Sequence, residues 1–378
     1  MILTSSRRIA AVAIGLLAAL VVTGCQPGSF SAPAQPAADI TDRSPLAEID
    51  WLEQPREWAG ASTAQLTTHR VIPITDSEPT TNLPVTLTSD DVAGPRQVTV
   101  TSAERIIAVD MSGSLAQTVW GLGLGDRLVG RDISTTFPGT EDLPVVTGTG
   151  HAISPESVLS LRPDIIITDG TVGPIDVMLQ LRQAGVTVVF IQVPPGIQQA
   201  AEQAIRVAEA LGLPAEGQAL AQRIDAEIDT VVATIRANVP ASRDAKLRMM
   251  FLYLRGSSGI YYLFGSESGA GELIEALGGI DVAGEIGWAG LRPVTDEALI
   301  AANPDLILVM TGGLTSVGGV EQLVQQKPAI GLTTAGQKRR FVDMADSEVL
   351  GFGPRTPLVL DALARAIYAP EPDATPVG

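Results

Sequence analysis

The sequence predicts an α/β protein with two Rossmann-like lobes joined by a single long helix. Short β-branched strands alternate with helices both before and after position 214, a pattern typical of doubly wound parallel sheets. Residues 214–238 form one amphipathic run, in which Leu220, Ile224 and Ile228 stand four positions apart. A helix-strand motif near residue 154 also recurs near residue 295, which indicates two similar halves.

Composition and charge limit the class of protein. The 378 residues are 45% hydrophobic and only 4% aromatic, which is enough apolar material for two domains with their own cores. The formal net charge of −17 argues against nucleic acid or an anionic membrane surface as the ligand.

The N-terminus has the pattern of an export signal. Arg7 and Arg8 precede an apolar run over residues 9–22 that is too short for a convincing transmembrane helix. The run ends in Val22-Thr23-Gly24-Cys25, which resembles a lipobox, and this cysteine is the only one in the chain. We therefore expect a lipoprotein signal peptide over 1–24 and lipidation at Cys25, with the protein anchored to the outer face of the cytoplasmic membrane. A secretory signal with an incidental cysteine is the alternative.

Residues 25–84 are predicted to be a flexible tether, because Pro, Ala, Ser and Thr predominate and no periodicity is sustained. Within this segment a short helix is expected near 46–58. His69 has no cluster of ligands around it, so it is expected to be solvated.

The N-terminal lobe is predicted over residues 85–213. Its first two strands, 85–88 and 98–101, are β-branched and flank a turn, which predicts a hairpin. The later strands are expected at 105–109, 128–130, 144–146, 163–168 and 186–191. The helices are expected at 114–121, 157–161, 175–184 and 197–211.

The long linking helix is predicted over 214–240, the C-terminal lobe over 241–370 and a tail over 371–378. In this lobe the strands are expected at 247–254, 260–264, 305–310 and 340–342. The helices are expected at 271–277, 295–302, 319–325 and 356–368.

The internal repeat places one glutamate in each lobe. Ser154-Pro155-Glu156 is followed by Pro163-Asp164, and Thr295-Asp296-Glu297 is followed by Pro304-Asp305, with equal spacing. In both copies a helix with a glutamate in its first turn ends at Pro-Asp before a buried strand. A glutamate there complements the helix dipole even without any further role.

Tyr253 and Arg255 stand two positions apart on a predicted strand, so both point to the same face with Phe251. An arginine beside a phenol favours the phenolate, which is a good ligand for ferric iron. A packed ring beside a solvated charge is the simpler interpretation of the same pair. The run Gly121-Leu122-Gly123-Leu124-Gly125 follows a helix, whereas a dinucleotide-binding loop must precede one, so we do not interpret it as such a loop.

The strand 105–109, the glycine-rich run 121–130 and the two Pro-Asp segments resemble the helical-backbone substrate-binding proteins of ABC importers for siderophores, cobalamin and haem. The resemblance covers about residues 85–368. It implies the class III periplasmic-binding-protein fold, in which one long helix joins two α/β lobes. It also implies that Glu156 and Glu297 dock onto arginines of a permease dimer, which works with a cytoplasmic ATPase.

His151 narrows the resemblance further. It lies in a glycine-rich loop of the first lobe, whereas Tyr253 and Arg255 lie in the second. This set resembles the HmuT-type haemin-binding lipoproteins. The resemblance implies that haem b is the transported ligand, held in the cleft between the lobes. His151 and Tyr253 are then the axial ligands of the iron, and Arg255 bonds the tyrosine.

Two other functions are alternatives to haem binding. A ferric-siderophore or cobalamin receptor of the same fold would hold its ligand with arginines and aromatic residues, and His151 would be incidental. A secreted hydrolase needs a nucleophile and a base, but the predicted lobes contain no cysteine, one histidine and no Gly-x-Ser-x-Gly elbow. We therefore expect a binding protein rather than an enzyme.

Overall fold

The computed structural model of the chain describes residues 39–256 and 259–371. The predicted signal peptide, Cys25 and most of the predicted tail lie outside these residues. Within the described ranges, no helix is both long enough and apolar enough to cross a membrane.

The first sheet is parallel and has the order β5-β4-β6-β7. Its strands are β4 (Ile106–Val109), β5 (Leu128–Gly130), β6 (Ile165–Thr168) and β7 (Thr187–Phe190). Every residue of β4 and β6 is buried, as expected for parallel strands covered by helices on both faces. The strand predicted at 144–146 is wrong, because only an isolated bridge joins Val145 to Arg131.

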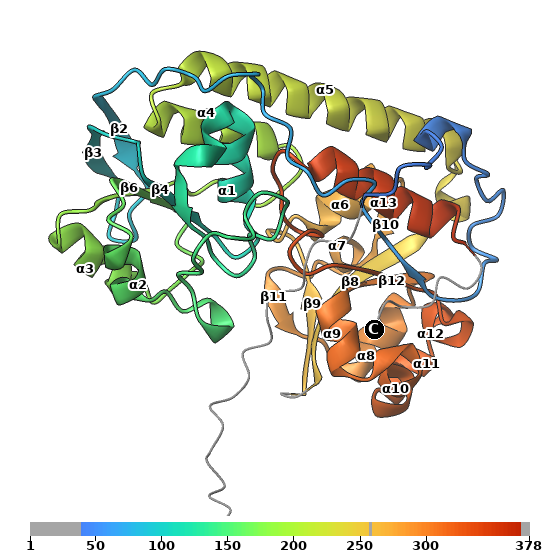
Figure 1. The fold of residues 1–378 in the computed structure, drawn as a ribbon. Coiled ribbons are helices and arrows are strands. Elements are labelled where there is room, and N and C mark those ends of the chain that lie inside the picture. Colours follow the sequence, from blue (N-terminus) through green and yellow to red (C-terminus); the bar gives the residue numbers. More distant parts are fainter. Residues whose placement is uncertain (1–38, 257–258, 372–378) are drawn as a thin grey trace, which may run out of the picture. The chain divides into compact units, whose positions relative to one another are not determined.

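Helices and a hairpin surround this sheet (Figure 1). The helices are α1 (Ser114–Val119), α2 (Pro155–Ser160), α3 (Ile175–Gln183) and α4 (Ala200–Ala210). The antiparallel pair of β2 (Val85–Ser89) and β3 (Arg96–Val100) confirms the predicted hairpin.

The second sheet has the order β1-β13-β12-β8-β9-β11, with β10 beside β8. Its central strand β8 (Arg248–Arg255) is parallel to β12 (Leu306–Met310) and antiparallel to β9 (Ile260–Phe264). The other strands are β1 (Ser62–Thr63), β10 (Ile280–Asp281), β11 (Leu291–Pro293) and β13 (Phe341–Met344).

The helices that follow β9 are α6 (Ala270–Ala276), α7 (Val282–Glu285), α8 (Asp296–Ala302), α9 (Thr311–Ser316), α10 (Gly319–Gln326), α11 (Pro328–Gly331), α12 (Thr334–Lys338) and α13 (Thr356–Tyr368). Of these, α7, α9, α11 and α12 were not predicted. Each is only four to six residues long, too short for a helical period to stand out in the sequence.

The long helix α5 (Pro214–Asn238) lies where the sequence predicts it and packs against both α4 and α13 (Figure 1). Its first residue is Pro214, and proline is common at the first position of a helix. The helix buries Leu220, Ile224 and Ile228 on one side. One hydrophobic cluster runs from Ile167 of the first sheet through this helix to Phe251 of the second. The predicted fold class is confirmed: two α/β lobes, one with a parallel sheet and one with a mixed sheet, are joined by one long helix. The exact limits of the lobes stay a prediction.

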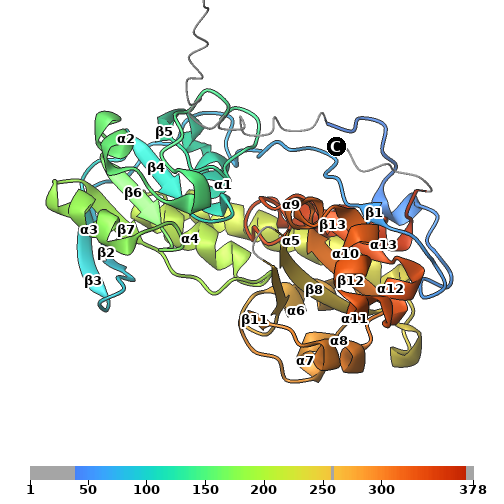
Figure 2. The same ribbon diagram turned by 90° about the horizontal axis from the view of Figure 1, so that it is seen from below.

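The prediction of a flexible tether is wrong for residues 39–84. The short strand β1 pairs with β13, beside α13 (Figure 2), and Leu66 is fully buried. Farther on, the Ile74 amide donates to the Gly121 carbonyl, and Glu78 forms an ion pair with Arg127 at 2.5 Å. The segment therefore contacts both lobes. Of the predicted helix near 46–58, only a single 3₁₀ turn forms, at Leu46–Glu48.

His69 also differs from the prediction, because it is not solvated. Its Nδ1 lies 2.9 Å from Oε1 of Glu348, and its side chain is only 12% exposed. Arg355, itself buried, lies 3.6 Å from the same carboxylate oxygen and donates to the His69 carbonyl. A histidine, a glutamate and an arginine thus form a buried network.

Candidate functional site

Tyr253 and Arg255 lie at the end of β8, on one face of the second sheet. Phe251 belongs to the core cluster on that face, whereas Leu252 and Leu254 belong to the cluster on the other face. The predicted alternation is therefore confirmed. Arg255 Nε donates a hydrogen bond of 2.6 Å to Tyr253 Oη, and its guanidinium carbon lies 5.5 Å from the centre of the ring. The phenol is half-buried and the arginine is exposed.

Aromatic and apolar residues continue this face toward the edge of the sheet. Tyr253 lies opposite Tyr262 on β9, and Leu291 on β11 lies opposite Phe264. Opposite residues in an antiparallel pair point to the same side. The Phe264 ring meets the Tyr253 ring edge-on, with ring centres 6.0 Å apart. The phenol is thus held between an arginine and an aromatic ring.

His151 ends a 3₁₀ turn, Thr149–His151, in the loop before α2, and it has a positive φ of 61°. The loop is fixed by its backbone: the Gly148 amide donates to the Ala152 carbonyl at 2.7 Å, and the Gly173 amide donates to the His151 carbonyl at 3.3 Å. The imidazole Nδ1 is buried, and no described atom is a hydrogen-bond partner for it. A non-glycine residue with a positive φ is uncommon and costs conformational energy, so the surrounding hydrogen bonds hold it there.

The electrostatics connect His151 to the other predicted residues. Burial lowers the pKa of His151, the positive charge of Arg255 lowers it further, and the negative charge of Asp110 opposes both effects. His151 therefore lies within electrostatic range of the same arginine that bonds Tyr253. The lowered pKa favours the neutral imidazole, which is the form that coordinates a metal.

The sequence analysis missed a group of three carboxylic acids in the first lobe, of which two are buried and one, Asp169, is half-buried. Asp110, Asp132 and Asp169 follow the ends of β4, β5 and β6, which are neighbours in the sheet. The Asp110 amide donates to Asp132 Oδ2 at 3.1 Å. Burial and the nearby Asp110 charge raise the pKa of Asp132 to about 7 and that of Asp169 to about 6. The available signal was an aspartate after each strand, but grouping them requires the strand order.

Glu156 and Glu297 lie in the first turns of α2 and α8, as predicted. Both side chains are exposed. Among the described residues neither carboxylate forms an ion pair, whereas the neighbouring Asp296 lies 3.0 Å from Nζ of Lys327.

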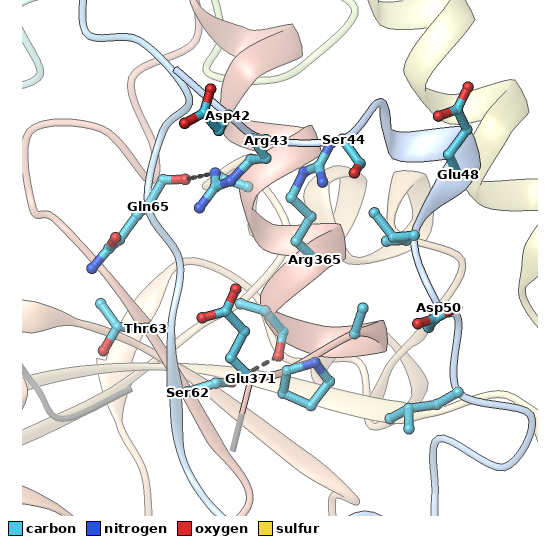
Figure 3. A pocket seen from close by; sticks show the side chains of 16 residues that line it. Asp42, Arg43, Ser44, Glu48, Asp50, Ser62, Thr63, Gln65, Arg365 and Glu371 are labelled. Atoms are coloured by element: carbon cyan, nitrogen blue, oxygen red, sulfur yellow. Dashed lines mark hydrogen bonds between the residues drawn. The ribbon is translucent and has the colours of Figure 1, made fainter. Parts of the chain in front are cut away.

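One pocket lies elsewhere and contains none of the predicted site residues. It has a volume of about 520 Å³ and lies between residues 42–65 and α13, with Arg43, Arg365 and Glu371 among its lining (Figure 3). Both arginines have partners: Arg43 donates to the Gln65 carbonyl, and Arg365 pairs with Asp361. In the described ranges, no three His, Cys, Asp or Glu side chains are arranged to hold a metal ion.

Residues 109–348 match the family model described as Periplasmic binding protein. The chain belongs to this family. The matched range contains His151, Tyr253 and Arg255 as well as both repeats of the helix-strand motif. The expectation from the sequence motifs is therefore confirmed at the level of the family and its fold.

Several solved structures of periplasmic binding proteins are similar to this chain. The crystal structure of heme binding protein HmuT is 38% identical, with a TM-score of 0.76, and the match covers 83% of this chain and 99% of that one. Other structures of HmuT carry alanine in place of a tyrosine, of an arginine two positions after it, or of a histidine. The periplasmic heme-binding protein RhuT from Roseiflexus sp. RS-1 is 34% identical, with a TM-score of 0.63 over 71% of this chain and 99% of that one.

Curated relatives are more distant. The uncharacterized ABC transporter substrate-binding lipoprotein YvrC from Bacillus subtilis is 24% identical over 289 residues, which cover 75% of this chain and 86% of that protein. A cobalamin-binding protein from Halobacterium salinarum is 26% identical over 269 residues, which cover 70% of this chain and 69% of that protein.

Proposed function

We propose that this periplasmic binding protein captures haem outside the cytoplasmic membrane and delivers it to an ABC permease. The observation that carries the proposal is the hydrogen bond of 2.6 Å from Arg255 to Tyr253 Oη, within electrostatic range of His151. The similarity to HmuT supports it, because a tyrosine and an arginine two positions apart, and a histidine, were chosen for substitution in that haem-binding protein.

The ligand chemistry of the three residues suits ferric haem. Tyr253 supplies an anionic oxygen, which stabilises the higher charge of iron, and His151 supplies a neutral nitrogen from the opposite lobe. Arg255 stabilises the phenolate with its charge and its N–H donor, and so helps to deprotonate the phenol when the iron binds. The same hydrogen bond draws electron density from the oxygen, which keeps the bond to iron weak enough for release.

The remaining features complete the transport role. Glu156 and Glu297 are proposed to dock onto arginines of the permease dimer, which works with its cytoplasmic ATPase. Lipidation of Cys25 is proposed to anchor the protein to the membrane after removal of residues 1–24. The protein holds its ligand without chemical change, so it is proposed not to be an enzyme.

Cobalamin is the second candidate ligand, and the similarity to the cobalamin-binding protein of Halobacterium salinarum favours it. A cobalamin site of this fold does not require an iron-binding pair. Substitution of Tyr253 and His151 therefore distinguishes haem from cobalamin. The same substitutions distinguish haem from a ferric siderophore.

The experiment is a titration of the purified apo-protein with haemin, cyanocobalamin and a ferric siderophore, followed by absorbance. We expect saturable binding of one haemin, with a spectrum that changes in Tyr253→Phe and in His151→Ala. Tyr262→Phe is the matched control, since this phenol lies opposite Tyr253 on the neighbouring strand. Identical haemin spectra in all of these proteins would exclude the axial pair, and binding of cyanocobalamin alone would exclude haem as the ligand.

Membrane anchoring has its own test. The variant Cys25→Ala should appear in the soluble fraction of cells, whereas the wild type stays with the membranes. Retention of the variant on membranes would contradict lipidation at this position.

A further inference from the structure

The helices α2 and α8 begin in the same way. In α2 the N-cap Ser154 accepts a hydrogen bond from the Ser157 amide at 3.2 Å, and in α8 the N-cap Thr295 accepts one from the Ala298 amide at 3.2 Å. The side-chain oxygen at each N-cap therefore fixes the first turn, which carries Glu156 in one lobe and Glu297 in the other. The repeat seen in the sequence is thus also a repeat of hydrogen bonds.

The two motifs also end in the same way. Arg162 and Asn303 occupy equivalent places after their helices, and both have a positive φ, of 47° and 38°. The aspartate of each Pro-Asp pair then binds a strand on the other side: Asp164 Oδ2 accepts from the Arg105 amide at 3.1 Å, and Asp305 Oδ2 accepts from the Arg248 amide at 3.0 Å. Both motifs therefore share the same N-cap hydrogen bond at the start of the helix and the same aspartate contact after its end.

One exposed aliphatic side chain recurs at the same place in each copy. Leu159 is 42% exposed and Ile300 is 41% exposed, and each follows its glutamate by three positions. Residues three apart lie on the same face of a helix, so each aliphatic side chain is next to its glutamate. The preceding residues, Val158 and Leu299, are buried and already hold the helices to the core. Among the described residues, Leu159 and Ile300 belong to none of the hydrophobic core clusters.

We infer that Leu159 and Ile300 belong to the docking surface, so that each lobe presents a paired patch: Glu156 with Leu159, and Glu297 with Ile300. The inference rests on the proposed function and extends its docking role. The partner that fits is a two-fold symmetric membrane protein, because the same patch appears once in each lobe, on the two copies of the helix-strand motif. Each subunit of this partner is expected to present a cation beside a small apolar recess.

The two members of each patch have different effects on binding. Exposed carboxylates without an intramolecular partner act through charge, which raises the association rate and makes it sensitive to salt. An aliphatic side chain contributes because it is removed from water when the complex forms. This contribution slows dissociation and does not depend on salt. Burying the exposed part of one such side chain is expected to strengthen docking by about tenfold.

The experiment uses the full chain and its haem permease with the ATPase, reconstituted in proteoliposomes. Docking affinity and its salt dependence are measured for the double variant Leu159→Ser with Ile300→Ser, and for Glu156→Gln with Glu297→Gln. We expect the aliphatic double variant to bind about a hundredfold more weakly through faster dissociation, with an unchanged salt dependence. The glutamate double variant should lose most of the salt dependence.

The matched control is Ile72→Ser with Val92→Ser, which removes two aliphatic side chains that are 59% and 66% exposed and belong to neither helix. It should dock like the wild type. Haemin titration of every variant keeps the two proposals apart, because all of them should bind haemin normally. If the aliphatic double variant docks as tightly as the wild type while the glutamate variant does not, the inference is overturned and the proposed function stands. An equal loss in the control and the aliphatic variant also overturns it.

Discussion

Arg255 holds the phenol of Tyr253 from a position two residues further along β8, through a hydrogen bond of 2.6 Å. Both side chains lie at the end of the strand, on the face that also carries Phe251 and Phe264. The arginine is therefore available to the tyrosine before any ligand arrives, and removing it tests the ligand chemistry directly.

Arg255→Ala is expected to weaken haemin binding by about ten- to a hundredfold, since a hydrogen bond to a charged group contributes about 1.5 to 3 kcal/mol. Absorbance titration of the variant with haemin measures the loss. Arg292→Ala is the control, because Arg292 stacks on Trp288 at 4.9 Å rather than on Tyr253. Equal losses in both variants would contradict the role of Arg255.

His151→Ala is expected to reduce haemin affinity less than Tyr253→Phe does. The Nδ1 of His151 has no described hydrogen-bond partner, so no second group orients the ring or raises its basicity. Added imidazole should restore the absorbance spectrum of His151→Ala, because it supplies the missing nitrogen. Failure of imidazole to change the spectrum, in a variant that still binds haemin, would contradict axial ligation by His151.

Asp169 should make the protein less stable as the pH rises. Burial and the Asp110 charge raise its pKa from 3.8 to about 6, so the folded state binds this proton more tightly than the unfolded chain does. The cost of the buried charge therefore grows as the pH rises from 3.8 to about 6 and levels off above that range. Asp169→Asn retains the oxygen that accepts from Thr171 and removes the charge. Its free energy of unfolding should exceed that of the wild type by about 1 to 3 kcal/mol at pH 8.

Urea denaturation at about pH 3 and at about pH 8 measures this difference. The gain of Asp169→Asn should almost disappear at about pH 3, where most of the wild-type carboxyl is protonated in both the folded and the unfolded state. Asp176→Asn is the control, since Asp176 is exposed in the first turn of α3 and should give no gain that grows with pH. A gain of the same size at both pH values would exclude the buried charge as its cause.

Glu348→Ala is expected to destabilise the protein by about 3 to 5 kcal/mol, because it leaves the buried Arg355 without its ion-pair partner. Chemical denaturation measures the loss. The double variant Glu348→Ala with Arg355→Met should recover part of it, since no unpaired charge remains. A loss in the double variant equal to the sum of the two single losses would show that the two side chains act independently.

The features that the sequence predicted well are those with local patterns. The side chains of β8 alternate between two core clusters, and α5 has enough turns for its apolar positions to show the helical period. The repeat around Glu156 and Glu297 was also visible, because it depends on residues within one short segment.

The features that were missed depend on partners far away in the chain. Ser62 pairs with Val342, and His69 with Glu348, so no local pattern distinguishes residues 39–84 from a free tether. The grouping of Asp110, Asp132 and Asp169 depends on which strands are neighbours in the sheet. Strand order is decided by packing rather than by the residues that precede each aspartate.

The hydrophobic cluster that extends from Ile167 to Phe251 limits how far the two lobes can separate. Two lobes that share one core resist wide separation, because exposing ~200 Å² of apolar surface costs about 5 kcal/mol. Thermal motion alone then rarely opens the molecule far enough to drop a bound ligand. For the proposed carrier, we therefore expect release to require a partner that contacts both lobes.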